Sequence, residues 1–345
     1  MTSIISTAWA QEEEAPKLQV SGAVDAYYKY DFGKSPNAYT SFTDSHNSFQ
    51  LGMANLILSQ QVGKVGFVAD LAVGPRADAA NGYVSEDGSI SSLSLIKQLY
   101  MTYSPTDYLT VTAGNFSTFV GYEVIDANGN FNYSTSYLFS NGPFYHTGVK
   151  LDFDLGNGVS AMAGIFNQTD TKFQTIDPKF YGLQLGYAPE DSGLALYLNY
   201  LYGNQSGDED VDDIVSQIDL TGTYQATDAF MIGLNSSYKS NTIEGMEGNY
   251  GFFGTALYLN YAITESFGLG ARGEHFEMYG GEDETGSALS ENVMEFTLSA
   301  NIKQGPLTII PEFRFDKASV DMFSDADDNP TDAATSFLVA AYYSF

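Results

Sequence analysis

The sequence predicts an all-β protein, a transmembrane antiparallel up-and-down β-barrel of about 16 strands with short periplasmic turns and long extracellular loops. Three observations lead to this fold class. Many segments alternate apolar and polar residues over roughly 10 to 16 positions, whereas strands of soluble sheets average about 5–6 residues and about 9–11 residues cross a bilayer. Short and long connections alternate between these segments. No stretch of about 18 apolar residues occurs, which excludes a transmembrane helix.

The composition agrees with a strand-rich protein and excludes several kinds of site. The chain has 345 residues with 34 Gly, 25 Tyr and 24 Phe, and only 17% of its residues are charged, which suits glycine-punctuated strands. Asp and Glu number 43 against 14 Lys and Arg, so a nucleic-acid partner is not expected. Cysteine is absent, which excludes disulfides, a thiolate nucleophile and Cys-ligated metals. We expect no cofactor.

The first ten residues, MTSIISTAWA, are similar to the end of a secretory signal with cleavage after Ala10. A complete signal has a basic start, but the first positive residue here is Lys17. We therefore interpret residues 1–10 as the remnant of a signal peptide and residues 11–17 as an N-terminal periplasmic tail. The alternative is a frayed terminus. The barrel domain is then 18–345.

The predicted strands follow in chain order, each identified by alternation and bounded by Gly, Pro, Asn or Asp. In the first half they are Leu18–Gly33, Asn47–Val62, Val65–Gly74, Leu93–Ser104, Tyr108–Phe116, Phe144–Asp154, Val159–Gln168 and Lys179–Ala188. In the second half they are Gly193–Gly203, Ile214–Gln225, Ala229–Ser240, Tyr250–Ala262, Ser266–Tyr279, Glu291–Lys303, Pro306–Lys317 and Ala334–Phe345. Seven tight turns and eight long loops place both termini on the periplasmic side.

One predicted strand conflicts with this pattern. In Leu93–Ser104, Lys97 has the same parity as Leu95 and Leu99, and a lipid-facing surface does not tolerate a lysine at mid-depth.

The two ends of the strands and the last strand carry membrane signals. Tyrosine and phenylalanine cluster near strand ends, where an interfacial girdle lies in membrane barrels. The last strand places Phe337, Val339, Ala341, Tyr343 and Phe345 on one alternating face. A terminal Phe closing such a strand resembles the C-terminal signal that the outer-membrane assembly machinery recognises, so this machinery and the lipid bilayer are predicted partners.

Three stretches carry a resemblance to a known family: residues 119–126 (FVGYEVID), residues 130–134 (NFNYS) and residues 140–150 (SNGPFYHTGVK). Together with the opening LQVSGAVDAYY at 18–28 and the C-terminal strand, they resemble the putative β-barrel porin-2 (OmpL-like) family. The resemblance implies an outer-membrane channel of a Gram-negative bacterium. It does not imply a particular substrate.

The longest aromatic connection is a candidate constriction. A barrel of about 16 strands encloses an aqueous channel. The segment Ser117–Pro143 is long and rich in Phe and Tyr, which is unusual for a solvated loop, and we expect it to fold into the lumen. Glu123 and Asp126 are its charges and would then face the permeating solute. The alternative is an ordinary extracellular loop packed over the mouth.

Charges on the inward parity of the strands predict the selectivity. The set contains nine acids and six bases: Asp25, Asp31, Asp70, Asp152, Asp219, Glu274, Glu295, Glu312 and Asp316 against Lys29, Lys150, Lys239, Arg272, Lys303 and Arg314. This mild acidic excess predicts a weak cation preference or little selectivity. The alternative is that these charges pair across strands, Arg272 with Glu274 and Glu312 with Arg314, and only stiffen the wall.

Most of the remaining acids lie on long connections, at Asp208–Asp213, Glu282–Glu284 and Asp325–Asp328. Carboxylates at such spacing bind Ca²⁺ or Mg²⁺ in some proteins, and such ions bridge to lipopolysaccharide. None of the three stretches has the EF-hand spacing, and a solvated, repulsive surface is the alternative interpretation.

The sequence therefore predicts an outer-membrane porin that passes small hydrophilic solutes or ions by diffusion. The alternatives are a non-conducting barrel with a structural or adhesive role through its acidic loops, and a soluble secreted all-β binding protein. An enzyme is not expected, because His46, His146 and His275 lie on separate segments and no catalytic motif is present. A homotrimer is compatible with a porin of this size, although no interface stripe stands out.

Overall fold

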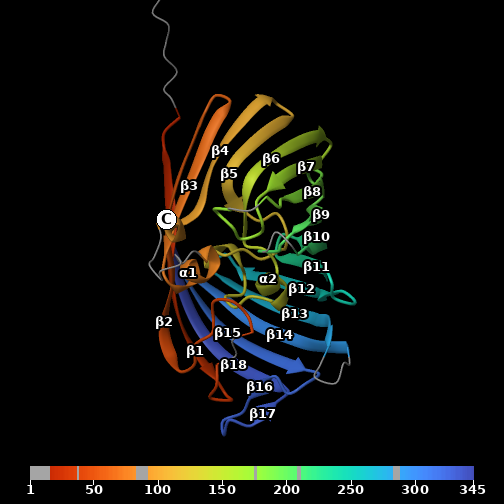
Figure 1. Cartoon of the computed structure of the whole chain (residues 1–345). Helices are drawn as coiled ribbons and strands as arrows, with labels where there is room; N and C mark the ends of the chain where they lie inside the picture. Colours follow the sequence, from red (N-terminus) through yellow and green to blue (C-terminus); the bar gives the residue numbers. More distant parts are fainter. Residues whose placement is uncertain (1–15, 37–38, 83–91, 175–176, 208–210, 283–287) are drawn as a thin grey trace, which may run out of the picture.

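The computed structural model describes residues 16–36, 39–82, 92–174, 177–207, 211–282 and 288–345. Within these residues, sixteen strands close into one barrel in which every neighbouring pair is antiparallel (Figure 1). The order around the wall follows the chain, and β18 closes the circle between β15 and β1. The predicted closed antiparallel barrel of about 16 strands is confirmed.

The strands match the predicted ranges to within a few residues at most ends. The first eight are β1 Gln19–Asp31, β2 Ser48–Val62, β3 Val65–Val73, β4 Ile96–Thr106, β5 Leu109–Ser117, β6 Tyr145–Gly156, β7 Val159–Phe166 and β8 Phe180–Tyr187. The other eight are β9 Leu194–Asn204, β10 Asp213–Thr227, β11 Phe230–Ile243, β12 Tyr250–Thr264, β13 Phe267–Glu282, β14 Ala288–Gln304, β15 Leu307–Ala318 and β18 Ala333–Ser344.

Short elements occupy the long connections. They are the hairpin of β16 (Phe323–Ser324) and β17 (Pro330–Thr331), the helices α1 (Pro75–Asn81) and α2 (Tyr137–Asn141), and the 3₁₀ turns η1 (Ser92–Leu95) and η2 (Ala127–Gly129). In the described part of the chain, no helix is long and apolar enough to cross a membrane.

The two ends of the chain close the barrel. β1 pairs with β18 in a continuous register from Ala23 with Ser344 to Asp31 with Ser336. Beyond this ladder, the Phe345 N–H donates to the Gly22 carbonyl at 3.0 Å and the Gly22 N–H donates to the Phe345 carbonyl at 3.1 Å. Closure leaves the barrel without a free strand edge, which is what a sheet in lipid requires.

The wall has an apolar outside and a polar inside. On β14, the outward Met294, Phe296 and Leu298 are exposed, whereas the alternating Glu295 and Thr297 are buried inside the barrel. The same alternation runs through the other long strands, so the outer surface is a broad apolar band. Such a band is unfavourable in water and favourable in a bilayer.

A β-bulge removes the conflict at Lys97. Asp70 of β3 pairs with Gln98 of β4, but the next residue, Leu71, pairs with Ile96, so Lys97 is an extra residue without a partner in the ladder. The bulge turns Lys97 into the barrel, where it is buried, while Leu99 stays on the outer face. Parity therefore fails at this position because the strand gains a residue.

Residues 118–144, the inner segment, join β5 to β6 and lie inside the curve of the barrel together with α1 (Figure 1). The four hydrophobic clusters of the described residues all combine inner-segment side chains with inward wall or loop side chains. Tyr137 and Leu138, for example, pack with Phe252 and Phe276 of β12 and β13. The hydrophobic core of this protein is therefore in the lumen, between the inner segment and the wall.

Candidate functional site

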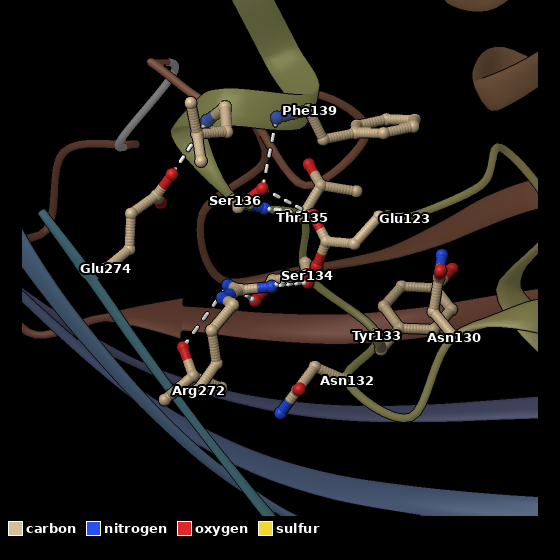
Figure 2. Close-up of polar contacts among 12 residues, drawn as sticks. Glu123, Asn130, Asn132, Tyr133, Ser134, Thr135, Ser136, Phe139, Arg272 and Glu274 are labelled. Atoms are coloured by element: carbon tan, nitrogen blue, oxygen red, sulfur yellow. Dashed lines mark hydrogen bonds and ion pairs between the residues drawn. The ribbon is translucent and has the colours of Figure 1, made fainter. Parts of the chain in front are cut away.

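Two wall carboxylates hold the backbone of the inner segment. Glu312 on β15 accepts the N–H groups of Tyr133 at 2.8 Å and Ser134 at 3.1 Å. Glu274 on β13 accepts those of Tyr137 and Leu138, both at 2.7 Å (Figure 2). The latter two N–H groups belong to the first turn of α2, which has no intrahelical acceptors for them, so the wall completes the helix end. Each carboxylate thus receives a pair of charge-assisted hydrogen bonds.

Arg272 on β13 is the centre of a fully buried ion-pair network (Figure 2). Its Nη1 lies 2.6 Å from Glu123 Oε1, and its Nε lies 3.0 Å from Glu295 Oε2 on β14. Nη1 also donates to the Ser134 carbonyl at 2.7 Å. The guanidinium therefore ties the inner segment to two strands of the wall at once.

Both carboxylate oxygens of Glu123 have partners in this network. Its second oxygen, Oε2, accepts the Ser136 N–H at 2.7 Å and the Ser136 hydroxyl at 2.6 Å. Both oxygens thus face protein, in contrast to the expectation that this carboxylate faces the solute. The structure assigns Glu123 to fixing the inner segment in place.

Arg314 on β15 has a similar position two strands further along the wall. Its Nη2 lies 2.8 Å from Asp316 Oδ1, and its Nη1 donates to the Thr135 carbonyl at 2.8 Å. The pairs expected from spacing, Arg272 with Glu274 and Glu312 with Arg314, do not form. Each arginine instead pairs with other carboxylates and reaches a carbonyl of the inner segment.

The five charges expected to line the pore on β13–β15 all point into the barrel, but none of them contacts an open lumen. Their exposed fractions do not exceed 4%, because the inner segment covers them; they are Arg272, Glu274, Glu295, Glu312 and Arg314. The alternation in the sequence correctly identified the inward face of these strands. It did not show that the inner segment covers that face.

Asp126 anchors the inner segment to another part of the wall, β2–β4. Its Oδ2 lies 2.6 Å from Lys97 Nζ, which also contacts Asp70 at 2.5 Å. Asn55 on β2 donates to Asp126 Oδ1 at 3.0 Å and to Asp70 Oδ1 at 3.1 Å. Of the two predicted constriction charges, Glu123 is buried and Asp126 is partly exposed to solvent.

Arg76 of α1 is a site residue that the sequence analysis missed. Its guanidinium lies between the rings of Phe42 and Tyr133, 4.8 and 4.7 Å from their centroids, and its Nη1 donates to the Ile125 carbonyl at 3.0 Å. The Tyr133 hydroxyl donates to Asp25 at 2.5 Å. Burial raises the pKa of Tyr133, so its hydroxyl stays protonated and remains a donor.

The start of the inner segment is attached to a third part of the wall. Asp219 on β10 accepts the Gly121 N–H at 3.0 Å, and it is oriented by the side-chain amides of Asn199 at 2.9 Å and Asn235 at 2.7 Å. The inner segment therefore crosses the lumen, from β10 at its beginning to β13–β15 and β2–β4 further along.

Two of the predicted lining charges do keep contact with solvent. Lys150 and Asp152 on β6 form an ion pair at 2.8 Å, and their side chains are 24% and 37% exposed. The pair is neutral as a unit. The inner segment therefore leaves this part of the wall, at β6, partly exposed.

The loop between β7 and β8 adds a cation on the long-loop side. Lys172 Nζ donates to the Asn81 carbonyl at 2.9 Å and lies 4.2 Å from the centroid of the Tyr145 ring. Burial lowers the pKa of Lys172 to about 8, although the Asp170 carboxylate nearby opposes this shift.

The acidic stretches show no metal cluster where the structure describes them. Asp208–Asp210 and residues 283–284 lie outside the described residues. Among the described residues, no group of three or more His, Asp or Glu side chains is placed to hold a metal ion. Asp325 Oδ1 accepts the N–H groups of Asp327 at 2.8 Å and Asn329 at 2.9 Å, and the pKa of this carboxyl is lowered by its hydrogen bonds to its own loop.

Several solved structures share the fold of this chain. Solved structures that resemble it include the in-vitro folded, trimeric form of OmpT, an outer membrane protein of Vibrio cholerae (13% identity, TM-score 0.64, 96% of this chain and 100% of that chain). Others are an anion-selective porin from Comamonas acidovorans (10%, 0.63, 95% and 99%) and the outer membrane channel DcaP of Acinetobacter baumannii (14%, 0.63, 98% and 100%). At these identities the likeness shows the fold. No curated protein sequence matches the chain.

The family assignment comes from the sequence as a whole. The model of the family described as "Putative beta-barrel porin-2, OmpL-like" matches residues 17–345, which is nearly the entire chain and all sixteen barrel strands. The chain therefore belongs to this family, and it is an outer-membrane porin.

Proposed function

We propose that this porin is a passive diffusion channel for small hydrophilic solutes and ions, with a weak cation preference or little selectivity. The observation that carries the proposal is the uneven filling of the lumen. The inner segment buries the inward faces of β13–β15, whereas inward side chains of β6–β10 such as Lys150, Asp152, Gln184 and Tyr197 stay partly exposed. A cavity of about 360 Å³ lies there, between Phe119 and Tyr122 of the inner segment and the wall of β8–β10.

The charges near this passage support low selectivity. The acids that give the sequence its inward excess are engaged with arginine, lysine or backbone N–H groups under the inner segment, and the solvent-exposed Lys150–Asp152 pair has no net charge. Fixed charges that face the permeating ion set the preference of a pore. Little selectivity, with at most a small bias toward cations, is therefore the expected behaviour.

The test is single-channel conductance of the detergent-purified protein in a planar bilayer with a KCl gradient. Discrete open steps with a small reversal potential of the cation-selective sign are expected. Silence from folded, inserted protein would instead favour a non-conducting barrel with a structural or adhesive role. A large reversal potential of the anion-selective sign would contradict the proposal that the charges facing the permeating ion nearly balance.

The partners are proposed on separate grounds. A homotrimer is supported by the trimeric form of the similar Vibrio OmpT, and light scattering of the detergent-purified protein tests it. Recognition by the outer-membrane assembly machinery is supported by the alternating apolar face of β18 and by Phe345, which follows the strand directly. Substitution Phe345→Ala should then lower the amount of porin inserted in the membrane. Contact of the acidic loops with lipopolysaccharide through divalent cations is tested by extraction with a chelator.

A further inference from the structure

We propose that a second cavity in the lumen is a binding subsite for a neutral polyhydroxylated solute of monosaccharide size. This inference rests on the proposed channel function and names a substrate class for it. The cavity has a volume of about 420 Å³, within the range of roughly 300–1,000 Å³ that is usual for small-molecule sites. Its lining includes Tyr122, Asn132, Tyr258, Asn260, Asn301 and Lys303.

The cavity lies between the inner segment and the short-turn end of the barrel. Asn260 is near the end of β12 at Thr264, and Asn301 and Lys303 are near the end of β14 at Gln304. Both strand ends lead into short turns, which are periplasmic in this topology. A solute that has passed the inner segment therefore reaches these residues before it leaves the lumen.

Two residues that line this cavity carry a buried amide oxygen for which the described residues supply no hydrogen-bond donor. These oxygens are Oδ1 of Asn132 and Oδ1 of Asn260, on residues that are 2% and 7% exposed. Buried polar atoms are almost always satisfied in native proteins, so an unsatisfied pair in one cavity indicates a missing donor. A hydroxyl-rich ligand supplies such donors.

The orientation of the Asn132 amide follows from its neighbours. Its Nδ2 donates to Ser299 Oγ at 2.7 Å, and that hydroxyl donates to Glu312 at 2.8 Å. Because the serine hydrogen is already committed to the carboxylate, Ser299 has to accept from Asn132. The nitrogen of the amide therefore faces Ser299, and the oxygen is the free atom.

The aromatic and charged groups of the cavity favour a neutral ligand. The ring of Tyr122 stacks on the buried ring of Tyr258 with centroids 4.3 Å apart and stays partly exposed, and such a ring packs against the C–H face of a sugar. The one carboxylate in the lining, Glu123, is already paired with Arg272, so it holds no site for a cation. Lys303 is exposed at the edge of the cavity, and an anion held there is the rival interpretation.

The floor of the cavity is held in one conformation. Val124 donates its N–H to Asn130 Oδ1 at 2.9 Å, and Asn130 Nδ2 donates back to the Val124 carbonyl at 2.6 Å. Asn301 Nδ2 donates to the Phe131 carbonyl at 2.9 Å. A subsite that is already ordered loses less entropy when the ligand binds.

The experiment measures the block of KCl current by D-glucose and by D-glucuronate, added on the short-turn side of single channels. We expect glucose to reduce the current in a saturable manner, and Asn260→Leu to weaken its apparent affinity about tenfold because a hydrogen-bond acceptor is replaced by an apolar group. The KCl conductance itself should change little. Asn260→Ala serves as a second variant if the larger side chain prevents folding.

Asn115→Leu on β5 is the matched control. Asn115 is also buried and also has an Oδ1 without a partner among the described residues, but it is not part of this cavity. Glucose block should be unchanged in this variant. A conducting channel that glucose does not block, equal block in wild type and Asn260→Leu, or block by glucuronate alone would each overturn the subsite.

The subsite and the channel can fail separately. If folded protein does not conduct KCl, the proposed function fails, and saturation-transfer NMR of glucose with the detergent-solubilised protein then decides the inference. A glucose signal that Asn260→Leu abolishes supports the subsite, and the absence of a signal overturns it.

Discussion

Arg272 illustrates how a single residue links the wall to the inner segment. It is fully buried between Glu123 and Glu295, and no other cation lies within ion-pair distance of Glu123 in the described structure. Removing one partner of a buried ion pair costs about 3–5 kcal/mol, because the remaining charge is left in a medium of low polarity. The cost falls on the inner segment, since the barrel ladder does not involve the guanidinium.

We therefore expect Arg272→Met to loosen the inner segment while the barrel stays closed. Single-channel recordings should show a higher and noisier conductance, and limited proteolysis should cut within residues 118–144. Lys150→Met is the control for the proteolysis, because the Lys150–Asp152 pair is partly exposed and exposed pairs contribute only about 0–1 kcal/mol. Quiet, wild-type conductance in Arg272→Met would show that hydrophobic packing alone holds the segment.

A substitution at Lys150 tests whether the permeating ion passes close to this residue. Lys150→Glu replaces a positive charge by a negative one beside Asp152, on a part of the wall that stays in contact with solvent. The reversal potential in a tenfold KCl gradient should shift clearly toward cation selectivity. Lys64→Glu makes the same charge change in the turn between β2 and β3 and should shift it much less. Equal shifts would place the passage elsewhere.

The lowered pKa of Lys172 predicts that the ion selectivity of the channel depends on pH. Burial lowers the pKa of this lysine to about 8, so its charge is present at pH 7 and is largely lost at pH 9. Loss of a cation on the long-loop side should move the reversal potential toward cation selectivity as the pH rises through 8, while Asp170 beside it stays ionised. Lys172→Met should already have the high-pH value at pH 7 and lose the dependence. Retention of the pH step in that variant would assign it to another group.

The inward charges show how far sequence reasoning reaches at the scale of residues. Parity on β13–β15 correctly placed Arg272, Glu274, Glu295, Glu312 and Arg314 inside the barrel, because side chains of a strand alternate between its faces. Parity carries no information on what covers a face. Glu123 is 149 positions from Arg272 in the sequence, and no local pattern predicts that contact.

At the scale of elements, long strands were predictable and short helices were not. A barrel strand repeats its alternation many times, and tight turns mark its ends, so a range such as Tyr250–Ala262 lies close to the observed β12, Tyr250–Thr264. α1 and α2 have seven and five residues and are too short to show a helical period. Leu93–Leu95 was expected to begin a strand and instead belongs to the turn η1, because apolar alternation over three residues does not distinguish the two.

The pairing of β4 with β5 depends on a glycine. Gly114 has a φ of 135°, and a Cβ at this position would lie 2.3 Å from the Leu99 carbonyl of β4. Gly114→Ala should lower the free energy of unfolding by about 1–3 kcal/mol, since a strained backbone and a close approach are both forced on the ladder. Urea titration followed by the gel mobility of the folded barrel measures the loss.

Gly63→Ala is the matched control for Gly114→Ala. Gly63 also has a positive φ, 58°, in the turn between β2 and β3, but a Cβ there would meet no atom within 4 Å. The left-handed conformation alone costs about 1 kcal/mol. A loss in Gly114→Ala no larger than in Gly63→Ala would mean that β4 and β5 adjust to the added methyl group.

The whole molecule consists of two parts that are stabilised in different ways. The wall is closed by backbone ladders from β1 to β18, and the inner segment is held by side-chain contacts within the lumen. The two ends of the inner segment are adjacent, because the Thr118 N–H donates to the Phe144 carbonyl at 3.1 Å. The segment can therefore be exchanged for a short linker without straining β5 or β6.

We expect a variant with residues 120–142 replaced by a Gly-Ser linker to insert as a closed barrel with a several-fold higher conductance, since a barrel of sixteen strands is wide enough for an aqueous channel. The exchange uncovers four carboxylates, Glu274, Glu295, Glu312 and Asp316, against the two guanidinium groups of Arg272 and Arg314. The reversal potential should therefore move toward stronger cation selectivity than in the wild type. A variant that inserts with unchanged conductance and selectivity would show that the inner segment does not limit permeation.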